Sequence, residues 1–238
     1  MENQILLEEE QVYVYLPTIV KNSCGSGYED DFSDPQSGWP IYEDDDLLYA
    51  YMNGEYQILS KKRNQIVAAS PGFQADNFTA NVSVHNAGST YGTYGIIFNI
   101  AEDWSHFHSF EIDPEGYFGI WRFSKAQGWQ LLFVNKSPYI NAGTAANNIK
   151  VRREGTSIEV YANDHLIASL ADGSFVGKYY LGLVITSYDQ GNLDVHFDDF
   201  SSTTTGCEST TRLSAQTAHH SLPVKPINSF QETITKSD

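Results

Sequence analysis

Apolar and polar residues alternate along most of this chain with the period of two that is typical of β-strands. The segments 78–86 (FTANVSVHN) and 157–162 (SIEVYA) show this alternation clearly, and no window of ten or more residues has the periodicity of an amphipathic helix. Turn-forming Gly, Pro, Asn and Asp residues separate the alternating segments. The pattern predicts strands at 47–52, 55–60, 78–86, 93–100, 106–112, 117–123, 128–135, 148–154, 157–162, 165–170, 179–187 and 193–200.

Two of the predicted turns contain residues that tolerate a positive φ. Asn53-Gly54 is the dipeptide most typical of a two-residue hairpin, and Asn163-Asp164 stands in the same position between two later strands. A dozen short strands joined by such turns predict an all-β fold, a two-sheet antiparallel jelly-roll sandwich. At 238 residues the chain is long enough for one such domain with a large core.

The two ends of the chain differ from the strand-rich region in composition. Residues 1–23 form an N-terminal extension whose segment QVYVYLPTIV resembles a strand, although Pro17 restricts it to a sheet edge. We expect this segment to add to a sheet edge, in the sharper version that of another subunit, which would make the protein a homo-oligomer. The sandwich is predicted to span 24–207, and 208–238 is a tail rich in Ser and Thr.

The chain is strongly acidic, with a formal net charge of −16 from 30 acidic and 14 basic residues. This charge repels phosphate backbones, so we expect no nucleic-acid partner, and a neutral glycan, a cation or a basic protein is the more compatible ligand. No apolar run approaches the ~20 residues that a membrane span requires. The acidic start MENQILLEEEQ lacks the basic-then-apolar order of a signal peptide, so a secreted protein would be present here in mature or trimmed form.

The two cysteines, Cys24 and Cys207, lie on either side of the strand-rich region. In a sandwich whose terminal strands are neighbours, they would be close enough to form a disulfide, which would close a very long loop. We expect this bridge and, with it, an oxidising compartment outside the cytosol. The alternative is two unrelated thiols.

The segment FEIDPEG, residues 110–116, has two interpretations. In a continuous strand, Glu111, Asp113 and Glu115 would share one face, and two of them could act as nucleophile and general acid on a glycosidic bond. Alternatively, Asp-Pro-Glu-Gly forms a type I turn with a glycine bulge, because proline cannot donate to a sheet ladder and glycine accepts a positive φ. The turn is the favoured interpretation, and it leaves Glu115 at the loop tip.

This turn sets a register in which Glu111 lies opposite Gly119 and Trp121 lies on the same face of the sheet. An indole stacks on a sugar ring and a carboxylate accepts hydrogen bonds from its hydroxyl groups, so Glu111 and Trp121 are candidate ligand-binding residues. Trp39 and Tyr188 are two further candidates, because loop-forming residues flank them. In the alternative, a second layer covers this face and Glu111 is satisfied internally. The opposite face is predicted to belong to the core, with Phe110, Ile112, Phe118 and Ile120.

Several segments, in this order, resemble the secreted bacterial domains of the concanavalin A-like lectin/glucanase superfamily. They lie within about residues 28–201 and are YEDDFSDPQSGWP, YMNGEYQI, YGIIFNI, FHSFEIDPEGYFGIWR, IEVYANDHLIASL and VHFDDF. The laminin-G-like and sugar-hydrolase-related branches are the most similar. The resemblance implies a concanavalin A-like sandwich, but it leaves the function open, because such domains include lectins, glycosidases and structural modules.

Calcium is common in that superfamily, and a structural calcium ion is the one cofactor that the resemblance implies. Calcium takes several oxygen ligands from carboxylates and carbonyl groups. Neighbouring terminal strands could bring together Asp30, Asp31 and Asp34 from one end of the sandwich and Asp198 and Asp199 from the other. The alternative is that Asp31 and Asp34, in the segment DFSDP, cap a turn and the remaining carboxylates are solvated.

Together these features favour a secreted, non-catalytic, extracellular or cell-surface module that binds glycan or packs into a surface assembly. One alternative is a glycoside hydrolase that uses Glu111 with Asp113 or Glu115. Another is a structural subunit of a filament or surface layer, joined to its copies through the terminal segments. The hydrolase needs two carboxyl groups roughly 5–9 Å apart in an open groove, whereas a glycan binder needs an exposed Trp or Tyr.

Overall fold

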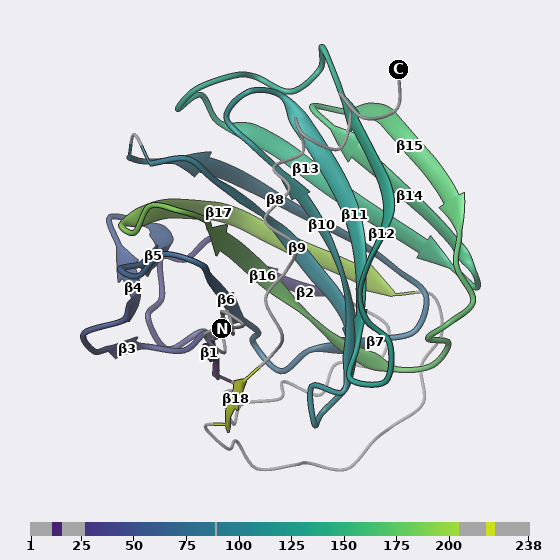
Figure 1. Ribbon diagram of the computed structural model, residues 1–238, viewed down its shortest axis with the longest axis horizontal. Coiled ribbons are helices and arrows are strands. Elements are labelled where there is room, and N and C mark those ends of the chain that lie inside the picture. The colour runs from purple at the N-terminus through teal and green to yellow at the C-terminus, as the bar shows by residue number, and fades with distance from the viewer. Residues whose placement is uncertain (1–10, 16–26, 89, 205–217, 222–238) are drawn as a thin grey trace, which may run out of the picture.

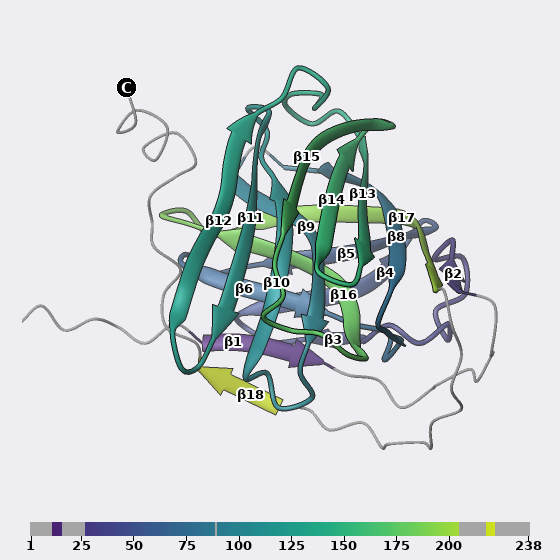
Figure 2. The same cartoon turned by 90° about the vertical axis from the view of Figure 1, so that its right-hand side faces the viewer.

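The computed structural model describes residues 11–15, 27–88, 90–204 and 218–221. These residues form two nine-stranded sheets, here called sheet A and sheet B, which pack face to face (Figures 1 and 2). The described part of the chain contains no helix, and so none that could cross a membrane. The predicted all-β, two-sheet sandwich is confirmed.

Sheet A contains the turn segment 110–116 and the strands on either side of it. Along the sheet its strands are β12 (Gly128–Lys136), β11 (Tyr117–Ser124), β10 (His106–Ile112), β9 (Gly92–Ile100), β16 (Tyr179–Ser187), β6 (Gln65–Ala69), β1 (Gln11–Tyr15) and β18 (Ala218–Ser221), with β7 (Gln74–Ala75) also paired to β16.

Sheet B forms the second layer. Its strands, in order, are β15 (His165–Ala171), β14 (Ser157–Ala162), β13 (Asn147–Glu154), β8 (Phe78–Asn86), β17 (Leu193–Thr204), β5 (Glu55–Ser60), β4 (Leu47–Met52) and β3 (Tyr42–Glu43), with β2 (Tyr28–Asp30) paired to β17. The two predicted dipeptide turns join β4 to β5 and β14 to β15, and Asn53, Asn163 and Asp164 all have a positive φ.

The terminal strands add to the same molecule. β1 pairs in parallel with β6 and antiparallel with β18, whereas all other pairs of described strands are antiparallel. The strand predicted within QVYVYLPTIV is therefore present at Gln11–Tyr15, where it pairs with β6 of its own chain (Figure 2). Addition of this segment to a sheet of another subunit stays a prediction. At the other end, β2 pairs with β17, as expected for neighbouring terminal strands. Cys24 and Cys207 lie outside the described residues.

The alternation pattern missed β6, because this strand is buried on both faces. All five of its residues are buried: Val67 and Ala69 lie in the core between the sheets, and Ile66 and Ala68 belong to a second apolar cluster on the other face of sheet A. A strand that is covered on both sides is continuously apolar and gives no period-two signal. Such a segment can be recognised from its apolar run but not from its alternation.

The core lies between the two sheets. Phe110, Ile112, Phe118 and Ile120 are all at most 1% exposed within it, which confirms the predicted inner face of β10 and β11. The second cluster uses the alternate positions of the same sheet and includes Trp104, Phe107, Phe123 and Tyr180, with Trp129 packed against it. Both faces of sheet A therefore carry a buried apolar cluster, whereas the outward positions of β8 in sheet B are polar and partly exposed.

Candidate functional site

The segment 110–116 forms the turn that the sequence predicted. The backbone N–H of Gly116 donates to the carbonyl oxygen of Asp113 at 3.2 Å, and the N–H of Asp113 donates to the carbonyl of Tyr117 at 3.0 Å. Gly116 has φ +88, and Glu111 lies opposite Gly119 in the β10–β11 ladder. The predicted turn and register are confirmed, and Glu115 is exposed at the tip.

Glu111 is held within the sheet by hydroxyl groups. It is 1% exposed, and its carboxylate accepts hydrogen bonds from Ser109 Oγ at 2.6 Å, Thr186 Oγ1 at 2.9 Å and Thr93 Oγ1. These donors come from β10, β16 and β9, so the carboxylate joins three neighbouring strands. The face that was predicted to meet a sugar is covered, and Glu111 is satisfied internally, as the alternative interpretation expected.

Asp113 is also buried and hydrogen-bonded within the fold. It is 0% exposed, and its carboxylate accepts hydrogen bonds from Tyr91 Oη at 2.9 Å and from the backbone N–H groups of Glu115 and Tyr117, both at 2.9 Å. Burial raises the pKa of Asp113, and these hydrogen bonds oppose the effect. Glu111 and Asp113 are 1% and 0% exposed, whereas the hydrolase alternative requires carboxyl groups in an open groove.

The aromatic residues predicted to form a ligand platform are buried. Trp39 is 3% exposed and lies in the core, with its ring centroid 5.1 Å from that of Phe200. Trp121 is 4% exposed and Tyr188 is 7% exposed. Flanking Gly, Pro and Asp residues suggested loop exposure for Trp39 and Tyr188, but side chains distant in sequence cover both, so the prediction of exposed platforms at these positions is wrong.

A different tyrosine is exposed. Tyr139, in the loop between β12 and β13, is 45% exposed and is the one aromatic residue among the exposed large hydrophobic side chains of the described chain. Its ring is stacked on the imidazole of His165, at the start of β15, with centroids 3.8 Å apart and an interplanar angle of 6°. The sequence signal that could have identified it is the Pro138–Gly143 loop, in which Tyr139 is the only aromatic residue.

An amide network holds Tyr139 in place. Asn163 Nδ2 donates to the carbonyl of Tyr139 at 2.8 Å and is also 2.9 Å from Asn147 Oδ1. Asn147 in turn accepts from the N–H of Asn141 at 2.7 Å. The carboxylate of Asp164, 89% exposed, extends from the same hairpin turn as His165. The result is an exposed aromatic ring on a loop that side-chain amides hold in place.

The aspartates predicted to bind calcium cap their own turns. Asp30 Oδ1 accepts from the N–H of Phe32 at 2.9 Å, Asp31 Oδ1 from that of Ser33 at 3.1 Å, and Asp34 Oδ1 from that of Gln36 at 2.9 Å. At the other end, Asp198 accepts from the N–H of Asp199 at 2.8 Å. The strands β2 and β17 are neighbours, as the prediction required, but the five carboxylates do not meet as a ligand group. Calcium binding stays a prediction.

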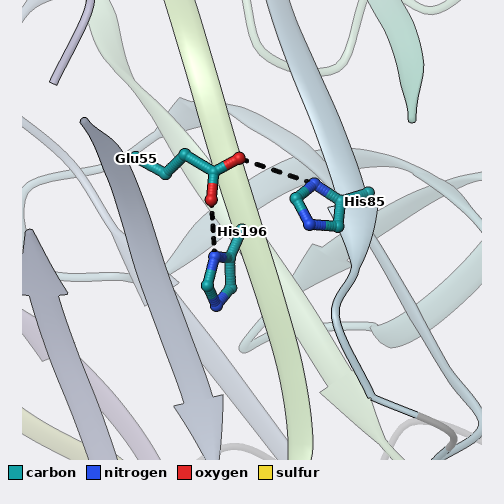
Figure 3. Close-up of side chains that lie close together, drawn as sticks. All are labelled: Glu55, His85 and His196. Atoms are coloured by element: carbon teal, nitrogen blue, oxygen red, sulfur yellow. Dashed lines mark hydrogen bonds and ion pairs between the residues drawn. The ribbon is translucent and has the colours of Figure 1, made fainter. Parts of the chain in front are cut away.

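The structure assembles a group that the sequence did not indicate. On sheet B, Glu55 of β5, His85 of β8 and His196 of β17 converge, with one ligand atom of each within 4.8 Å of the others (Figure 3). Glu55 Oε2 is 2.8 Å from His196 Nδ1, and Glu55 Oε1 is 3.8 Å from His85 Nδ1. No other group of three or more potential metal ligands of this kind lies in the described residues.

Acidic groups surround this cluster. Asp194 Oδ1 lies 3.4 Å from His196 Nε2 and accepts a hydrogen bond from Gln57 Nε2 at 2.8 Å. The hydrogen bond to Asp194, followed by that to Glu55, raises the pKa of His196 against the effect of burial. Burial and then the negative charges of Asp199, Glu55 and Asp31 raise the pKa of the nearby Asp198. Several carboxylates therefore lie close to the two histidines.

Comparison with known proteins identifies the fold. No protein-family model and no curated protein sequence matches the chain. Among solved structures, a carbohydrate-binding module from Bacillus subtilis is 16% identical and has a TM-score of 0.57, with 70% of this chain and 95% of that chain covered. The β-glucanase of Bacillus licheniformis is 10% identical with a TM-score of 0.57, covering 77% of this chain and 100% of that one.

A third similar structure is a Bacillus subtilis protein of unknown function with a galectin-like fold. It is 10% identical with a TM-score of 0.58, and the match covers 76% of this chain and 97% of that chain. These three likenesses show that the chain has the concanavalin A-like sandwich fold, which the sequence resemblance had implied. At such low identity they establish the fold alone.

Proposed function

We propose that this protein is a non-catalytic glycan-binding module that acts outside the cell or at its surface, and that Tyr139 and His165 form its sugar-binding platform. The observation that carries the proposal is the exposed Tyr139 ring, stacked at 3.8 Å on His165 and fixed by hydrogen bonds of the surrounding loop. A ring that is already ordered loses little conformational entropy when a sugar stacks on it. The Asp164 carboxylate, which is 89% exposed and 3.6 Å from Lys150 Nζ, immediately precedes His165 and can accept hydrogen bonds from sugar hydroxyl groups.

The fold and the burial of two carboxylates support glycan binding over glycoside hydrolysis. The sandwich matches almost the whole of a bacterial carbohydrate-binding module, a class of protein whose function is recognition. Glu111 and Asp113, the carboxylates that the hydrolase alternative would use, are buried and saturated with hydrogen bonds from hydroxyl and backbone groups.

A glycan array tests the proposal. The intact protein is screened with and without a chelator, beside Tyr139→Ala, Tyr139→Phe and Ile41→Ala, the last a control at a 62% exposed apolar position away from the platform. We expect binding to fall by about 10-fold or more in Tyr139→Ala, equivalent to ~1.4 kcal/mol, and to persist in Tyr139→Phe and Ile41→Ala, because stacking requires the ring. The proposal would be refuted if the folded wild type bound none of the glycans, or if Tyr139→Ala bound them as well as the wild type does.

A further inference from the structure

We propose that Glu55, His85 and His196 form a binding site for a divalent transition-metal ion, with zinc as the best-matched probe. This inference is independent of the proposed glycan site, which lies on other residues. It rests on the convergence of one carboxylate and two imidazoles on the solvent-facing side of sheet B (Figure 3). Two histidines and one carboxylate are a known ligand set for zinc, with the fourth position open to water or a further ligand.

The sheet register brings the ligands together. His196 lies directly opposite His85 on one side and opposite Gln57 on the other, because β17 pairs with both β8 and β5. Glu55 is two residues before Gln57 on β5, so its side chain projects from the same face. Three adjacent strands thus each contribute one ligand from a rigid ladder.

The distances suit a small tetrahedral ion after modest side-chain movement. Ligand atoms that surround zinc at about 2.0–2.1 Å lie roughly 3.3 Å apart in a tetrahedron. Glu55 Oε2 is 2.8 Å from His196 Nδ1, and the other carboxylate oxygen, Oε1, is 3.8 Å from His85 Nδ1. One ligand atom from each residue lies within 4.8 Å of the others, so small side-chain rotations bring three of them to tetrahedral spacing. The side chains of Glu55, His85 and His196 are 30%, 27% and 10% exposed, so an ion has access from solvent.

A second carboxylate, that of Asp194, orients His196, which is the most buried of the three proposed ligands. His196 directs Nδ1 towards the cluster and Nε2 towards Asp194, whose carboxylate is itself held by Gln57. Metal-binding histidines characteristically donate their other ring N–H to a carboxylate, which fixes the tautomer and the ring orientation. A simple surface ion pair between Glu55 and His196 does not require this second carboxylate.

The ligand types select among cations. Imidazole nitrogen suits zinc, copper, nickel and iron, whereas calcium and magnesium prefer sites made of oxygen atoms. The carboxylates of Glu55, Asp194 and Asp198 give the site a surplus of negative charge, which a divalent cation offsets. This site therefore differs in chemistry from the calcium ion that the aspartates of β2 and β17 were predicted to bind.

Calorimetric titration of the chelator-treated full-length protein with Zn²⁺ tests the site. We expect one Zn²⁺ per chain, and a fall in affinity of at least about 10-fold in His85→Gln and His196→Gln. Asp194→Asn keeps all three ligands and should weaken binding by about 10- to 100-fold, because it removes the partner that orients His196. Ca²⁺ and Mg²⁺ at the same concentration should give no comparable heat.

Two controls separate this site from other histidines. His165→Gln removes an exposed imidazole elsewhere on sheet B, and the double variant His219→Ala/His220→Ala removes adjacent histidines near the C-terminus; both should bind Zn²⁺ as the wild type does. Circular dichroism and the urea midpoint verify that each variant is folded. Absence of saturable Zn²⁺ binding by the folded wild type, unchanged affinity in His85→Gln, or loss of binding only in the double variant would overturn the proposal. Failure of the glycan array leaves this result unaffected.

Discussion

Replacing Glu111 by glutamine distinguishes a structural carboxylate from a catalytic one. The substitution keeps the shape of the side chain and removes its charge. Glu111 is 1% exposed and accepts hydrogen bonds from hydroxyl groups on β9, β10 and β16. If these bonds hold three strands in place, the variant loses stability; if the carboxylate serves chemistry, the variant loses activity instead.

The size of the effect follows from the three hydrogen bonds of Glu111. A hydrogen bond to a charged acceptor contributes about 1.5–3 kcal/mol, and one between neutral groups about 0.5–1.5 kcal/mol. The difference is roughly 1 kcal/mol for each of the bonds from Thr93, Ser109 and Thr186. The amide of glutamine also presents a donor where the carboxylate presented an acceptor. We therefore expect Glu111→Gln to lower the free energy of unfolding by about 2–4 kcal/mol.

Urea unfolding, followed by tryptophan fluorescence, measures this loss. Glu115→Gln is the matched control, since it makes the same change at the exposed tip of the adjoining turn and should alter stability by less than about 0.5 kcal/mol. Equal unfolding midpoints for Glu111→Gln and the wild type would refute the structural role. Hydrolysis of a β-glucan by the wild type that Glu111→Gln abolished would favour the hydrolase alternative.

Two further predictions concern pH and the cysteines. Burial, together with the positive charges of Arg153 and Arg122, lowers the pKa of His108, although the nearby Asp172 opposes the shift. When the pH falls below about 6.5, the pKa of His in the unfolded chain, His108 is therefore protonated in the unfolded protein and still neutral in the folded one. The free energy of unfolding therefore falls as the pH falls, by up to ~1.4 kcal/mol per pH unit from this residue. In His108→Gln the urea midpoint should change less between pH 7 and pH 5 than it does in the wild type. An equal pH dependence of the midpoint in both proteins would contradict this role of His108. Tyr28 and Ser202 lie opposite each other in the β2–β17 ladder. Cys24 is four residues before Tyr28 and Cys207 is five residues after Ser202, so both cysteines are close in sequence to paired residues. We expect the intact protein to resist alkylation until it is reduced, and modification of both thiols in unreduced protein would exclude the bridge.

Local chemistry made part of this fold predictable. The turn at 113–116 and the register of β10 and β11 followed from Pro114, Gly116 and the alternation of neighbouring residues, all of which act within a few positions of each other. The inner face with Phe110 and Ile120 followed from the same register. The strand β6 was missed because burial on both sides removes the alternation that marks a strand.

Exposure was less predictable than strand position. Trp39 and Tyr188 stand beside turn residues, yet their surroundings bury them; Trp39 contacts Tyr28, Phe32, Tyr56 and Phe200. Tyr139 follows a proline in a similar loop and stays 45% exposed. The flanking sequence of these residues is alike in type, so what separates a core ring from a surface ring is which distant side chains pack over it.

The sequence by itself determined most of the strands, the two hairpin turns and the sandwich, because alternation and turn chemistry depend on neighbouring residues. Only the tertiary structure decided which polar side chains meet. Glu55 and His196 are 141 residues apart in the chain, and they are brought to 2.8 Å by the pairing of β5 with β17. Strand order in a sheet arises from packing of the whole domain, so no local sequence pattern around Glu55, His85 or His196 predicts the site that they form.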